Sequence, residues 1–294
     1  MDDYFFIVNP VAGSGAALRK FAQVEQLLKQ KCIRYGKALT TAPQHAAALA
    51  KQALARGKTR IIAVGGDGTV GEVASALCNT SATMGILPFG TGNDLARTLC
   101  LPTQPEEALG VVLGGDSRQV DAGEANGKFF INEAGFGFDV DVLQCTESFK
   151  KRFTGMIPYL LGLVRALSHL RPLHLTIRYG EQTLEQDSLL IAVGNGRFFG
   201  GGMQVLPNAC PFDGQFDVCV VKHMTLGRFL AILPRFVKGK HIGLPEITYF
   251  RTDAVQVDCT TESPLNLDGE VGLNVPVTFR LLPGALRVLL ASQA

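Results

Sequence analysis

The sequence lacks the short-range patterns that mark several common protein classes. Its seven cysteines are scattered, odd in number and without a Cys-x-x-Cys pair, which argues against a disulfide framework or a zinc site and favours a reduced cytosolic protein. Low-complexity tracts and internal repeats are absent. The formal net charge is only +2, so we expect no bulk attraction to nucleic acid and no nucleic-acid partner.

Segments that would place the chain in a membrane are lacking as well. The N-terminus, Met1-Asp2-Asp3-Tyr4, is acidic and leads into a predicted strand, so we expect no signal peptide. The apolar stretch 156–170 contains Pro158, Arg165 and His169 and is therefore a poor transmembrane span. With 294 residues, of which 47% are hydrophobic and 18% charged, the chain can bury a sizeable core in one large domain or two smaller ones.

Glycine, in contrast, is abundant, with 33 residues, many of them in clusters. Ile61 to Val64 predicts a buried parallel strand, and Gly65 to Gly71 follows it directly. These glycines let the backbone approach a ligand closely. The segment Thr69 to Leu77 fits a helix, whose first turn would direct N–H groups and a positive dipole end at the same place. An anion site at the end of this strand is predicted, with a plain tight turn as the simpler alternative.

This loop differs from the two best-known nucleotide-binding loops. No Lys-Ser/Thr pair closes it, as in a Walker A motif, and its spacing is not that of the dinucleotide fingerprint. Asp67 lies among the glycines. Because a carboxylate repels phosphate unless a metal ion lies between them, Asp67 suggests Mg²⁺.

The same order of strand, glycine-rich loop and helix occurs on either side of this loop. Tyr4 to Val8 leads into Asn9 to Gly15, and Met84 to Leu87 leads into Pro88 to Asp94, each followed by a helical pattern. A further strand is expected over 37–41 and a further helix over 44–56. Residues 1–100 therefore predict a parallel sheet wrapped by helices.

The pattern changes near residue 122. Beyond it, short alternating strands bounded by turn residues replace most helices, which predicts an antiparallel sandwich or barrel. We therefore predict two domains, residues 1–122 and 123–294. At the C-terminus, Thr278 to Leu282 and Leu286 to Leu290, on either side of Pro283-Gly284, predict a hairpin.

Two apolar segments interrupt this β pattern. The first has a basic start at 149–153 and continues over 156–170, and the second runs from Leu226 to Val237 after Thr225, a candidate N-cap. Each segment fits a helix on an anionic membrane surface. Packing against the rest of its own domain is an equally good interpretation.

Taken together, the loops resemble one family, the bacterial diacylglycerol-kinase-type lipid kinases of the YegS and BmrU kind. The matching residues, in the order of the family, are Asn9-Pro10 with Gly13 and Gly15, 65–69, 88–94, 132–137, Asn195-Gly196 with Gly200 to Gly202, 207–209 with Asp213-Gly214, and 267–270. The glycine loop at 65–69 would be shared with NAD kinases. The run at 88–94 and the Asp-Gly-Glu at 268–270 narrow the resemblance to lipid kinases.

The resemblance implies a fold and a set of site residues. The fold is an N-terminal parallel α/β nucleotide domain, similar to NAD kinases and phosphofructokinases, followed by a C-terminal antiparallel β-sandwich domain. The implied ATP contacts are Asn9, Gly13, Thr40, Gly65, Gly66, Asp67, Gly68, Thr69, Val70, Gly71 and Thr91. The implied catalytic Mg²⁺ site is Asp67, Asp94 and Asp121, and a second, structural Mg²⁺ is implied at Asp213 with the backbone carbonyls of Cys210 and Gln215. Glu270, with Asp268, has the place of the general base, and which of the two accepts the proton stays open.

The residues themselves leave alternatives open. Asp67 and Asp94 each follow a predicted buried strand, so a parallel sheet places them at one edge, where neighbouring carboxylates favour a divalent ion. Asp94 also fits an N-cap, and Asp121 fits a simple turn. Asp268-Gly269-Glu270 puts two carboxylates on one side of an extended strand, but Asp-Gly is a common turn pair, which the residues alone favour. Whether Thr40 or Thr41 faces the nucleotide is open too.

These observations predict an ATP- and Mg²⁺-dependent kinase that phosphorylates a lipid hydroxyl, on diacylglycerol, phosphatidylglycerol or a sphingoid-type acceptor. The alternatives are an NAD-kinase-like enzyme with a soluble substrate and a nucleotide-dependent, lipid-binding regulatory protein. The apolar, basic-flanked segment 149–170 favours the membrane acceptor. We expect a cytoplasmic protein in peripheral contact with the inner face of the membrane, and the sequence leaves open whether it forms a homodimer.

Overall fold

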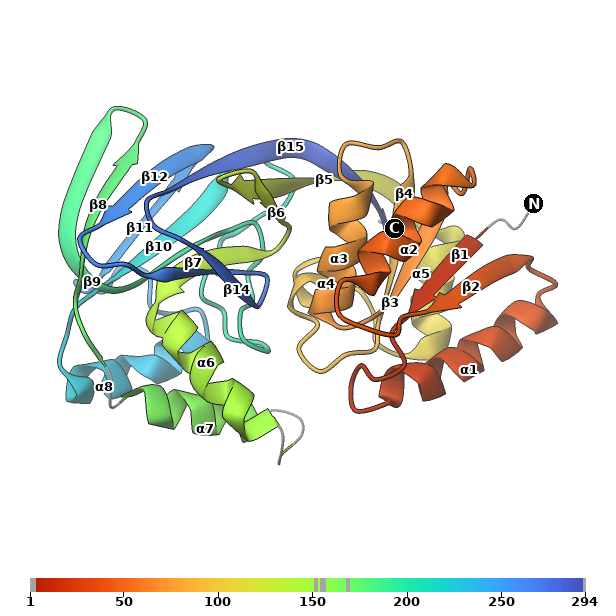
Figure 1. Cartoon of the computed structure of the whole chain (residues 1–294), viewed down its shortest axis with the longest axis horizontal. Coiled ribbons are helices and arrows are strands. Elements are labelled where there is room, and N and C mark those ends of the chain that lie inside the picture. Colours follow the sequence, from red (N-terminus) through yellow and green to blue (C-terminus); the bar gives the residue numbers. More distant parts are fainter. Residues whose placement is uncertain (1–3, 151–152, 154–156, 168–169, 293–294) are drawn as a thin grey trace. The chain divides into compact units, whose positions relative to one another are not determined.

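A computed structural model of the chain describes residues 4–150, 153, 157–167 and 170–292, which form two compact units (Figure 1). The first unit contains the residues up to Asp121 and those from Pro283 onward, and the second contains Ala122 to Leu282. The chain therefore returns to its first unit at the C-terminal end, whereas the division expected from the sequence left all of 123–294 in the second domain.

The first unit alternates strands with helices. Its elements are β1 (Tyr4–Val8), α1 (Ala16–Gln30), β2 (Tyr35–Leu39), α2 (His45–Ala55), β3 (Arg60–Gly65), α3 (Asp67–Leu77), β4 (Thr83–Pro88), α4 (Asp94–Thr98) and α5 (Pro105–Gly114), completed by the end of β15 (Val277–Leu290). The strands are parallel and lie in the order β15-β4-β3-β1-β2. The expected parallel α/β fold is thereby confirmed.

Both faces of this sheet are covered by helices. Phe6, Ile62 and Leu87 belong to one core cluster together with residues of α1 and α5. Helices α2 and α3 pack against each other and against the strands, and Figure 1 shows them on the other side of the sheet. Coverage of both faces explains why β3 is an unbroken apolar run rather than an alternating pattern.

Strand β15 corrects one sequence-based expectation, the C-terminal hairpin. Residues 277–290 form one continuous strand, of which the first part pairs antiparallel with β12 (Ala254–Cys259) in the second unit. The later part pairs parallel with β4, with Arg287 opposite Thr83. Pro283-Gly284 has the composition of a turn, but the two halves of the strand find different partners and do not pair with each other.

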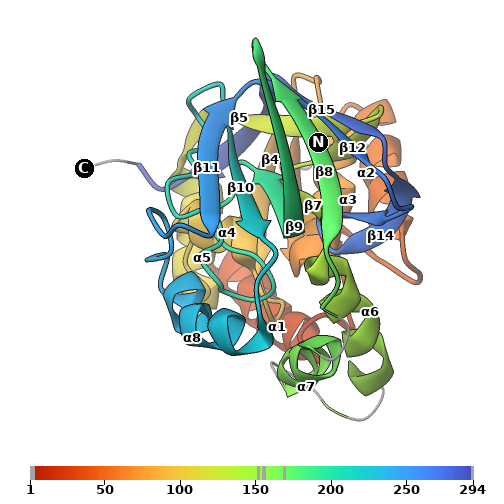
Figure 2. The ribbon, with the colours of Figure 1, turned by 90° about the vertical axis from the view of Figure 1, so that its left-hand side faces the viewer.

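The second unit is mainly antiparallel. Its elements are β5 (Asp116–Ala125, which begins in the first unit), β6 (Lys128–Phe130), β7 (Glu133–Gly137), α6 (Phe138–Lys150), α7 (Ile157–Ala166), β8 (Leu173–Tyr179), β9 (Gln182–Gly194), β10 (Phe216–Lys222), α8 (Leu226–Val237), β11 (Ile247–Thr252), β12, β13 (Pro264–Leu267), β14 (Glu270–Asn274) and the first part of β15. Figure 2 shows β11, β10, β9 and β8 side by side, in agreement with their antiparallel pairing.

Two apolar clusters lie on opposite faces of β9 and β10. Ile191 and Val218 point into a core shared by strands from most of this unit. Ala192 and Cys219, one residue further along each strand, pack instead with α6, α7 and α8. Since successive side chains of a strand alternate between faces, β10 reads as a continuous apolar run because both of its faces are buried.

Three helices of the second unit lie at one end of it, the lower end in both views (Figures 1 and 2). Helix α6 was not expected from the sequence, although Asp139 and Asp141 in its first turn are typical of a helix start. Helices α7 and α8 match the two predicted apolar segments, but Lys151, Arg152, Met156 and His169 lie outside the described residues. None of the helices among the described residues has the length and apolar character needed to cross a membrane.

Candidate active site

Three loops leave neighbouring strands at the same edge of the parallel sheet. Val8 of β1 lies opposite Val64 of β3, and Val64 lies opposite Leu87 of β4. The loops that follow these residues are the three glycine-rich motifs, because parallel strands end together at one edge. The predicted convergence of these motifs is therefore present in the structure.

Main-chain atoms of all three loops approach one another closely. A Cβ placed on Gly90 would lie 2.2 Å from Cα of Gly66, and one on Gly13 would lie 2.7 Å from the carbonyl oxygen of Phe89. Real Cβ atoms are not found this close to other heavy atoms. Glycine is therefore required at Gly90 by the close approach and at Gly13 also by its φ of +58°. The result is a cradle built from backbone at the start of α3.

Thr69 is held inside this cradle. Its hydroxyl accepts a hydrogen bond from Nδ2 of Asn9 at 3.0 Å, and only 4% of the residue is exposed. A Cβ on Gly65 would lie 2.6 Å from the Thr69 hydroxyl oxygen. The Oδ1 atom of Asn9 accepts from the N–H of Val11 at 3.2 Å. Asn9 thus ties its own loop to the first turn of α3.

Asp67 links the second loop to the third. Its Oδ1 atom accepts hydrogen bonds from the N–H groups of Asp94 at 2.7 Å and Leu95 at 3.4 Å, so it caps the start of α4. Burial raises the pKa of the Asp67 carboxyl group, and these backbone donors oppose that effect. A nearby cation would favour the charged form of this group.

The other two expected magnesium carboxylates have different surroundings. Asp94 is buried in the first turn of α4. Asp121 is buried as well and accepts a hydrogen bond from the N–H of Gly284 at 2.7 Å. Within the described part of the chain, no three His, Cys, Asp or Glu side chains lie close enough to form a metal-binding group. Asp67, Asp94 and Asp121 therefore do not form a three-carboxylate centre here.

Further expected nucleotide contacts lie around the same edge. Thr40 follows β2, is 8% exposed and donates its N–H to the carbonyl of Val8 at 2.9 Å. Thr41 is exposed and hydrogen-bonds with His45 at 3.0 Å. The buried neighbour of the cradle is thus Thr40. Among the other expected contacts, Gly68 and Thr91 are exposed, Gly66 and Gly71 are partly buried, and Gly65 and Val70 are buried.

Two residues that support these loops were not identified from the sequence. Glu72 of α3 accepts from the N–H groups of Gln44 at 2.9 Å and Ala46 at 2.8 Å, which caps α2. The side chain of Asn93 both accepts from and donates to the backbone of Gly90, at 3.0 and 3.1 Å. The Asn-Asp pair at 93–94 could have suggested a loop-closing amide, whereas Glu72 sits in an ordinary helical pattern.

The Asp268-Gly269 pair forms the turn between β13 and β14 in the second unit, as the residues alone favoured. Both residues have positive φ, 50° and 89°, as a two-residue hairpin turn of type I′ requires. The carboxylate of Asp268 accepts from the N–H groups of Ile131, Asn132 and Glu133 at 2.7 to 2.9 Å. With both oxygens engaged, Asp268 anchors the turn to the start of β7.

A buried side-chain pair supports the same turn. Oδ1 of Asn266 accepts from the N–H of Gly269 at 2.8 Å, and Nδ2 of Asn266 donates to Asp139 at 3.3 Å. Burial raises the pKa of Asp139 to about 7. Neither Asn266 nor Asp139 was identified from the sequence, because nothing in their local pattern links residues 127 positions apart. Glu270, directly after the turn, is exposed.

The expected structural magnesium site has a cationic side chain in place. Asp213 forms an ion pair with the guanidinium group of Arg251, and its Oδ1 atom accepts from the N–H of Gln215 at 3.1 Å. Cys210 lies three residues earlier in the same loop and is partly buried. Arg251 also faces a second carboxylate, the buried Asp217, at 3.7 Å, so the structural Mg²⁺ at Asp213 stays a prediction.

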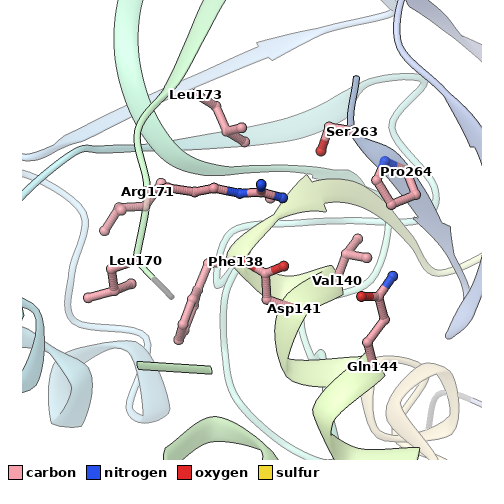
Figure 3. A pocket seen from close by; sticks show the side chains of 11 residues that line it. Phe138, Val140, Asp141, Gln144, Leu170, Arg171, Leu173, Ser263 and Pro264 are labelled. Atoms are coloured by element: carbon pink, nitrogen blue, oxygen red, sulfur yellow. The ribbon is translucent and has the colours of Figure 1, made fainter. Parts of the chain in front are cut away.

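A pocket of about 200 Å³ lies in the second unit beside the start of α6 (Figure 3). Phe138, Leu170 and Leu173 contribute apolar walls, and Arg171 extends its side chain across the pocket. Ser263 and Gln144 add polar groups to the lining. This combination suits an amphiphilic group.

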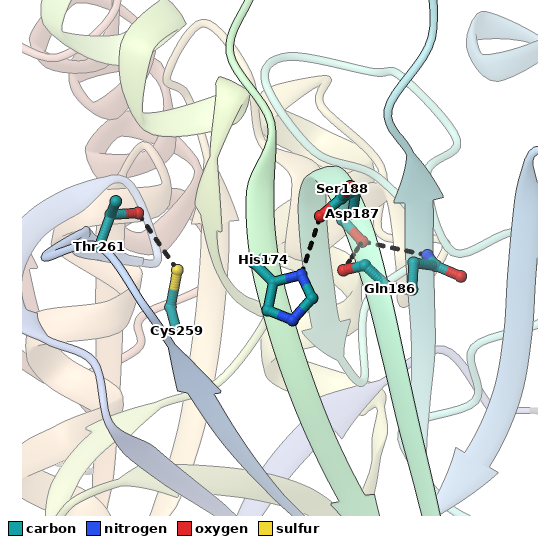
Figure 4. Close-up of polar contacts among 6 residues, drawn as sticks. All are labelled: His174, Gln186, Asp187, Ser188, Cys259 and Thr261. Carbon is teal, nitrogen blue, oxygen red and sulfur yellow. Dashed lines mark hydrogen bonds and ion pairs between the residues drawn. The ribbon is translucent and has the colours of Figure 1, made fainter.

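His174 and Cys259 make polar contacts within the second unit (Figure 4). His174 of β8 pairs with Asp187, its cross-strand neighbour on β9, at 2.9 Å. The thiol of Cys259 lies 3.4 Å from the hydroxyl of Thr261. All seven cysteines are free thiols.

Comparison with known families assigns both halves of the chain. The diacylglycerol kinase catalytic domain matches residues 3–125, and the YegS C-terminal NAD kinase beta sandwich-like domain matches residues 132–290. Over 290 residues the chain is 32% identical to the diacylglycerol kinase of Bacillus subtilis (strain 168), covering 98% of this chain and 96% of that protein. It is 36% identical over 247 residues to a protein of Chromohalobacter salexigens named "probable lipid kinase YegS-like", covering 81% and 78%.

A solved structure has the same fold along its whole length. The crystal structure of a Bacillus anthracis str. Sterne protein, described as a "putative diacylglycerol kinase", aligns with a TM-score of 0.82 and 26% identity, covering 98% of this chain and 97% of that one. The antiparallel second unit is thereby of the sandwich type that the sequence led us to expect. The chain belongs to the diacylglycerol-kinase-type family of lipid kinases that includes YegS.

Proposed function

We propose that this protein transfers the γ-phosphoryl group of ATP to a hydroxyl group of a membrane lipid, with which it makes peripheral contact. The observation that supports the proposal is the close backbone approach of Gly66 and Gly90, which brings main-chain groups of two loops together at the start of α3, where a helix N-terminus favours an anion. Family membership supports the acceptor class, because the relatives carry the names diacylglycerol kinase and lipid kinase.

The first unit holds the nucleotide in this proposal. Backbone N–H groups of the loops at Gly13, 65–71 and Thr91 hold the phosphates. The hydroxyl of Thr69 is fixed by Asn9 and adds a donor without bulk. Thr40, which is buried next to this edge of the parallel sheet, is the last of the proposed nucleotide contacts. Phosphoryl transfer depends mainly on positioning and charge neutralisation, so a rigid backbone cradle suits it.

The catalytic Mg²⁺ is part of the proposal and is compatible with the residues present. Mg²⁺ is usually held by one or two carboxylates together with substrate phosphates, so a full protein cage is not required. Asp67 fits this role because it is partly buried beside the cradle and a cation would favour its charged form. Asp94, in the adjoining loop, is the second candidate, and Asp121 the third. The bound ion would neutralise charge on the transferred phosphate.

The second unit supplies the proton acceptor in this proposal. The lipid hydroxyl loses its proton to the carboxylate of Glu270, its oxygen bonds to the γ-phosphorus, and the bond from that phosphorus to ADP breaks. Asp268 and Asn266 hold the turn that precedes Glu270. Asp268 is therefore assigned a positioning role and Glu270 the role of base. The pocket at Phe138 and Arg171 supports an amphiphilic acceptor.

The test is transfer of radiolabelled γ-phosphate from ATP to a panel of lipids in mixed micelles, with NAD and buffer alone as controls. We expect a labelled organic-phase product that requires Mg²⁺, and its identity names the acceptor. Label on NAD alone would support the NAD-kinase-like alternative instead. ATP binding without transfer to any acceptor would support the regulatory alternative.

A further inference from the structure

Helix α8 has two apolar faces, of which only one is buried. Phe229, Ile232 and Phe236 point into the cluster beneath β9 and β10 and are at most 6% exposed. Leu226, Leu230 and Val237 point away from that cluster and are 44%, 46% and 48% exposed. Spacings of four and seven residues place the three exposed side chains on one side of the helix. We call this row the α8 stripe.

Further exposed apolar groups lie after the C-terminal end of α8 and on the neighbouring helix α7. Ile242, shortly after the helix, is 38% exposed. Helix α7 packs into the same cluster as α8 through Leu163 and Ala166. On the outside, α7 exposes Ile157 and Val164, seven residues apart, at 53% and 59%. Single exposed apolar residues need no explanation, but a row on one helix face does.

The charge around the stripe is mainly positive. From Lys222 to Pro245 the chain contains five Lys and Arg residues and no Asp or Glu, although the whole chain is nearly balanced at 28 against 26. Arg228 is paired with Glu246. Arg235, Lys238 and Lys240 are exposed near the C-terminal end of the helix. An apolar row beside cations is the pattern of a helix that lies in the interface of an anionic bilayer.

We propose that the α8 stripe is the surface by which this protein docks on anionic membranes, with Leu226, Leu230 and Val237 entering the lipid and Arg235, Lys238 and Lys240 contacting acidic headgroups. This inference rests on the proposed lipid-kinase function and adds the surface that reaches the substrate. A second copy of the chain is a poorer occupant, because a symmetric contact would bring the same cations face to face.

The experiment is sedimentation of the full-length protein with vesicles of phosphatidylcholine alone or with about one-third phosphatidylglycerol. Partial burial of one leucine side chain in lipid strengthens binding about fivefold. We therefore expect Leu230→Ser to bind anionic vesicles about fivefold more weakly than wild type, and the double variant Leu226→Ser/Leu230→Ser about 25-fold more weakly. Leu18→Ser is the matched control, since Leu18 is 43% exposed on α1, and it should bind like wild type. Arg235→Gln/Lys238→Gln should lose affinity for anionic vesicles only.

The design separates this inference from the proposed function. Circular dichroism melting checks that each variant is folded, and transfer to a short-chain, water-soluble acceptor should be unchanged in the stripe variants while transfer to vesicle-embedded acceptor falls. The inference is overturned if the double variant binds vesicles as tightly as wild type, or if wild type itself does not bind them. If wild type forms a dimer, and the double variant is monomeric but binds vesicles like wild type, the stripe is instead the contact with a second copy of the chain. If wild type binds vesicles but transfers no phosphate to any acceptor, only the proposed kinase activity is refuted.

Discussion

The two halves of the chain hold their expected site residues in different ways. The cradle of the first unit consists of main chain, with Gly66 and Gly90 in contact and Thr69 held by one amide. The turn before Glu270 in the second unit is held by carboxylate and amide side chains, above all by Asp268 and Asn266. One half depends on the absence of side chains, and the other depends on their hydrogen bonds.

This difference determines how each half can fail. A backbone cradle tolerates no added atom, because a clash between main-chain segments has no flexible end that can move away. A hydrogen-bonded turn tolerates shape-conserving changes but responds to the charge of its buried groups. Steric substitutions should therefore be most damaging in the first unit, and changes of protonation in the second.

The largest effect is expected from Gly90→Ala. The new methyl group would lie 2.2 Å from Cα of Gly66 and 2.8 Å from its nitrogen, so the two loops must separate. We expect ATP binding to be lost beyond detection in isothermal titration calorimetry. Gly110→Ala is the control, because its Cβ meets nothing within 4 Å and lies inside helix α5. That change should leave ATP binding intact and stabilise the protein by about 0.5–1 kcal/mol. Normal ATP affinity in Gly90→Ala would refute the cradle.

Glu270→Gln should abolish phosphoryl transfer without changing the cradle. The amide cannot accept the hydroxyl proton, and loss of a general base typically lowers the rate by about 10²–10⁴-fold. Because Glu270 is exposed and lies in the second unit, the Kd for ATP and the melting temperature should stay within error of wild type. Single-turnover transfer to lipid measures the rate. A wild-type rate in this variant removes Glu270 from the role of base.

The first unit was the more predictable half from the sequence, for the same physical reason. Apolar runs followed by glycines are local signals, and parallel strands bring them to one edge without further information, so Gly66, Thr69 and Gly90 could be placed together. The capping of α4 by Asp67 and of α2 by Glu72 could not be predicted, since each joins different loops through one side chain.

The second unit shows where sequence patterns stop being informative. The Asp268-Gly269 turn follows from local composition, but its anchors at Ile131 to Glu133 are more than 130 residues away in the chain. The hairpin expected around Pro283-Gly284 was wrong because turn composition carries no information about which partner a strand will find.

The pH dependence of stability tests the role of the Asp139 carboxyl group in the second unit. Burial raises its pKa from an ordinary value of 3.8 to about 7. Between these two values the unfolded chain has released this proton while the folded protein still binds it, so stability falls as pH rises from about 4 to about 7 and is then constant. This shift corresponds to a loss of up to about 4 kcal/mol.

Asp139→Asn should remove that loss, because the amide is neutral at every pH and can still accept from Asn266. Urea unfolding at pH 5 and pH 8 measures the effect as the difference in unfolding free energy between the two pH values. We expect this difference to shrink by about 3 kcal/mol in Asp139→Asn, with a more stable variant at pH 8. An unchanged difference would mean that Asp139 is already charged in the folded protein at pH 5.

The smallest effect distinguishes two adjacent threonines at the edge of the cradle. Thr40 is buried beside Val8, whereas the Thr41 hydroxyl is engaged with His45. If Thr40 donates one hydrogen bond to the nucleotide, Thr40→Val should weaken ATP binding about three- to tenfold, as expected for loss of about 0.5–1.5 kcal/mol. Thr41→Val, with the same change of shape, should leave the Kd for ATP unchanged. Titration of both variants with ATP decides, and the reverse pattern would assign the contact to Thr41.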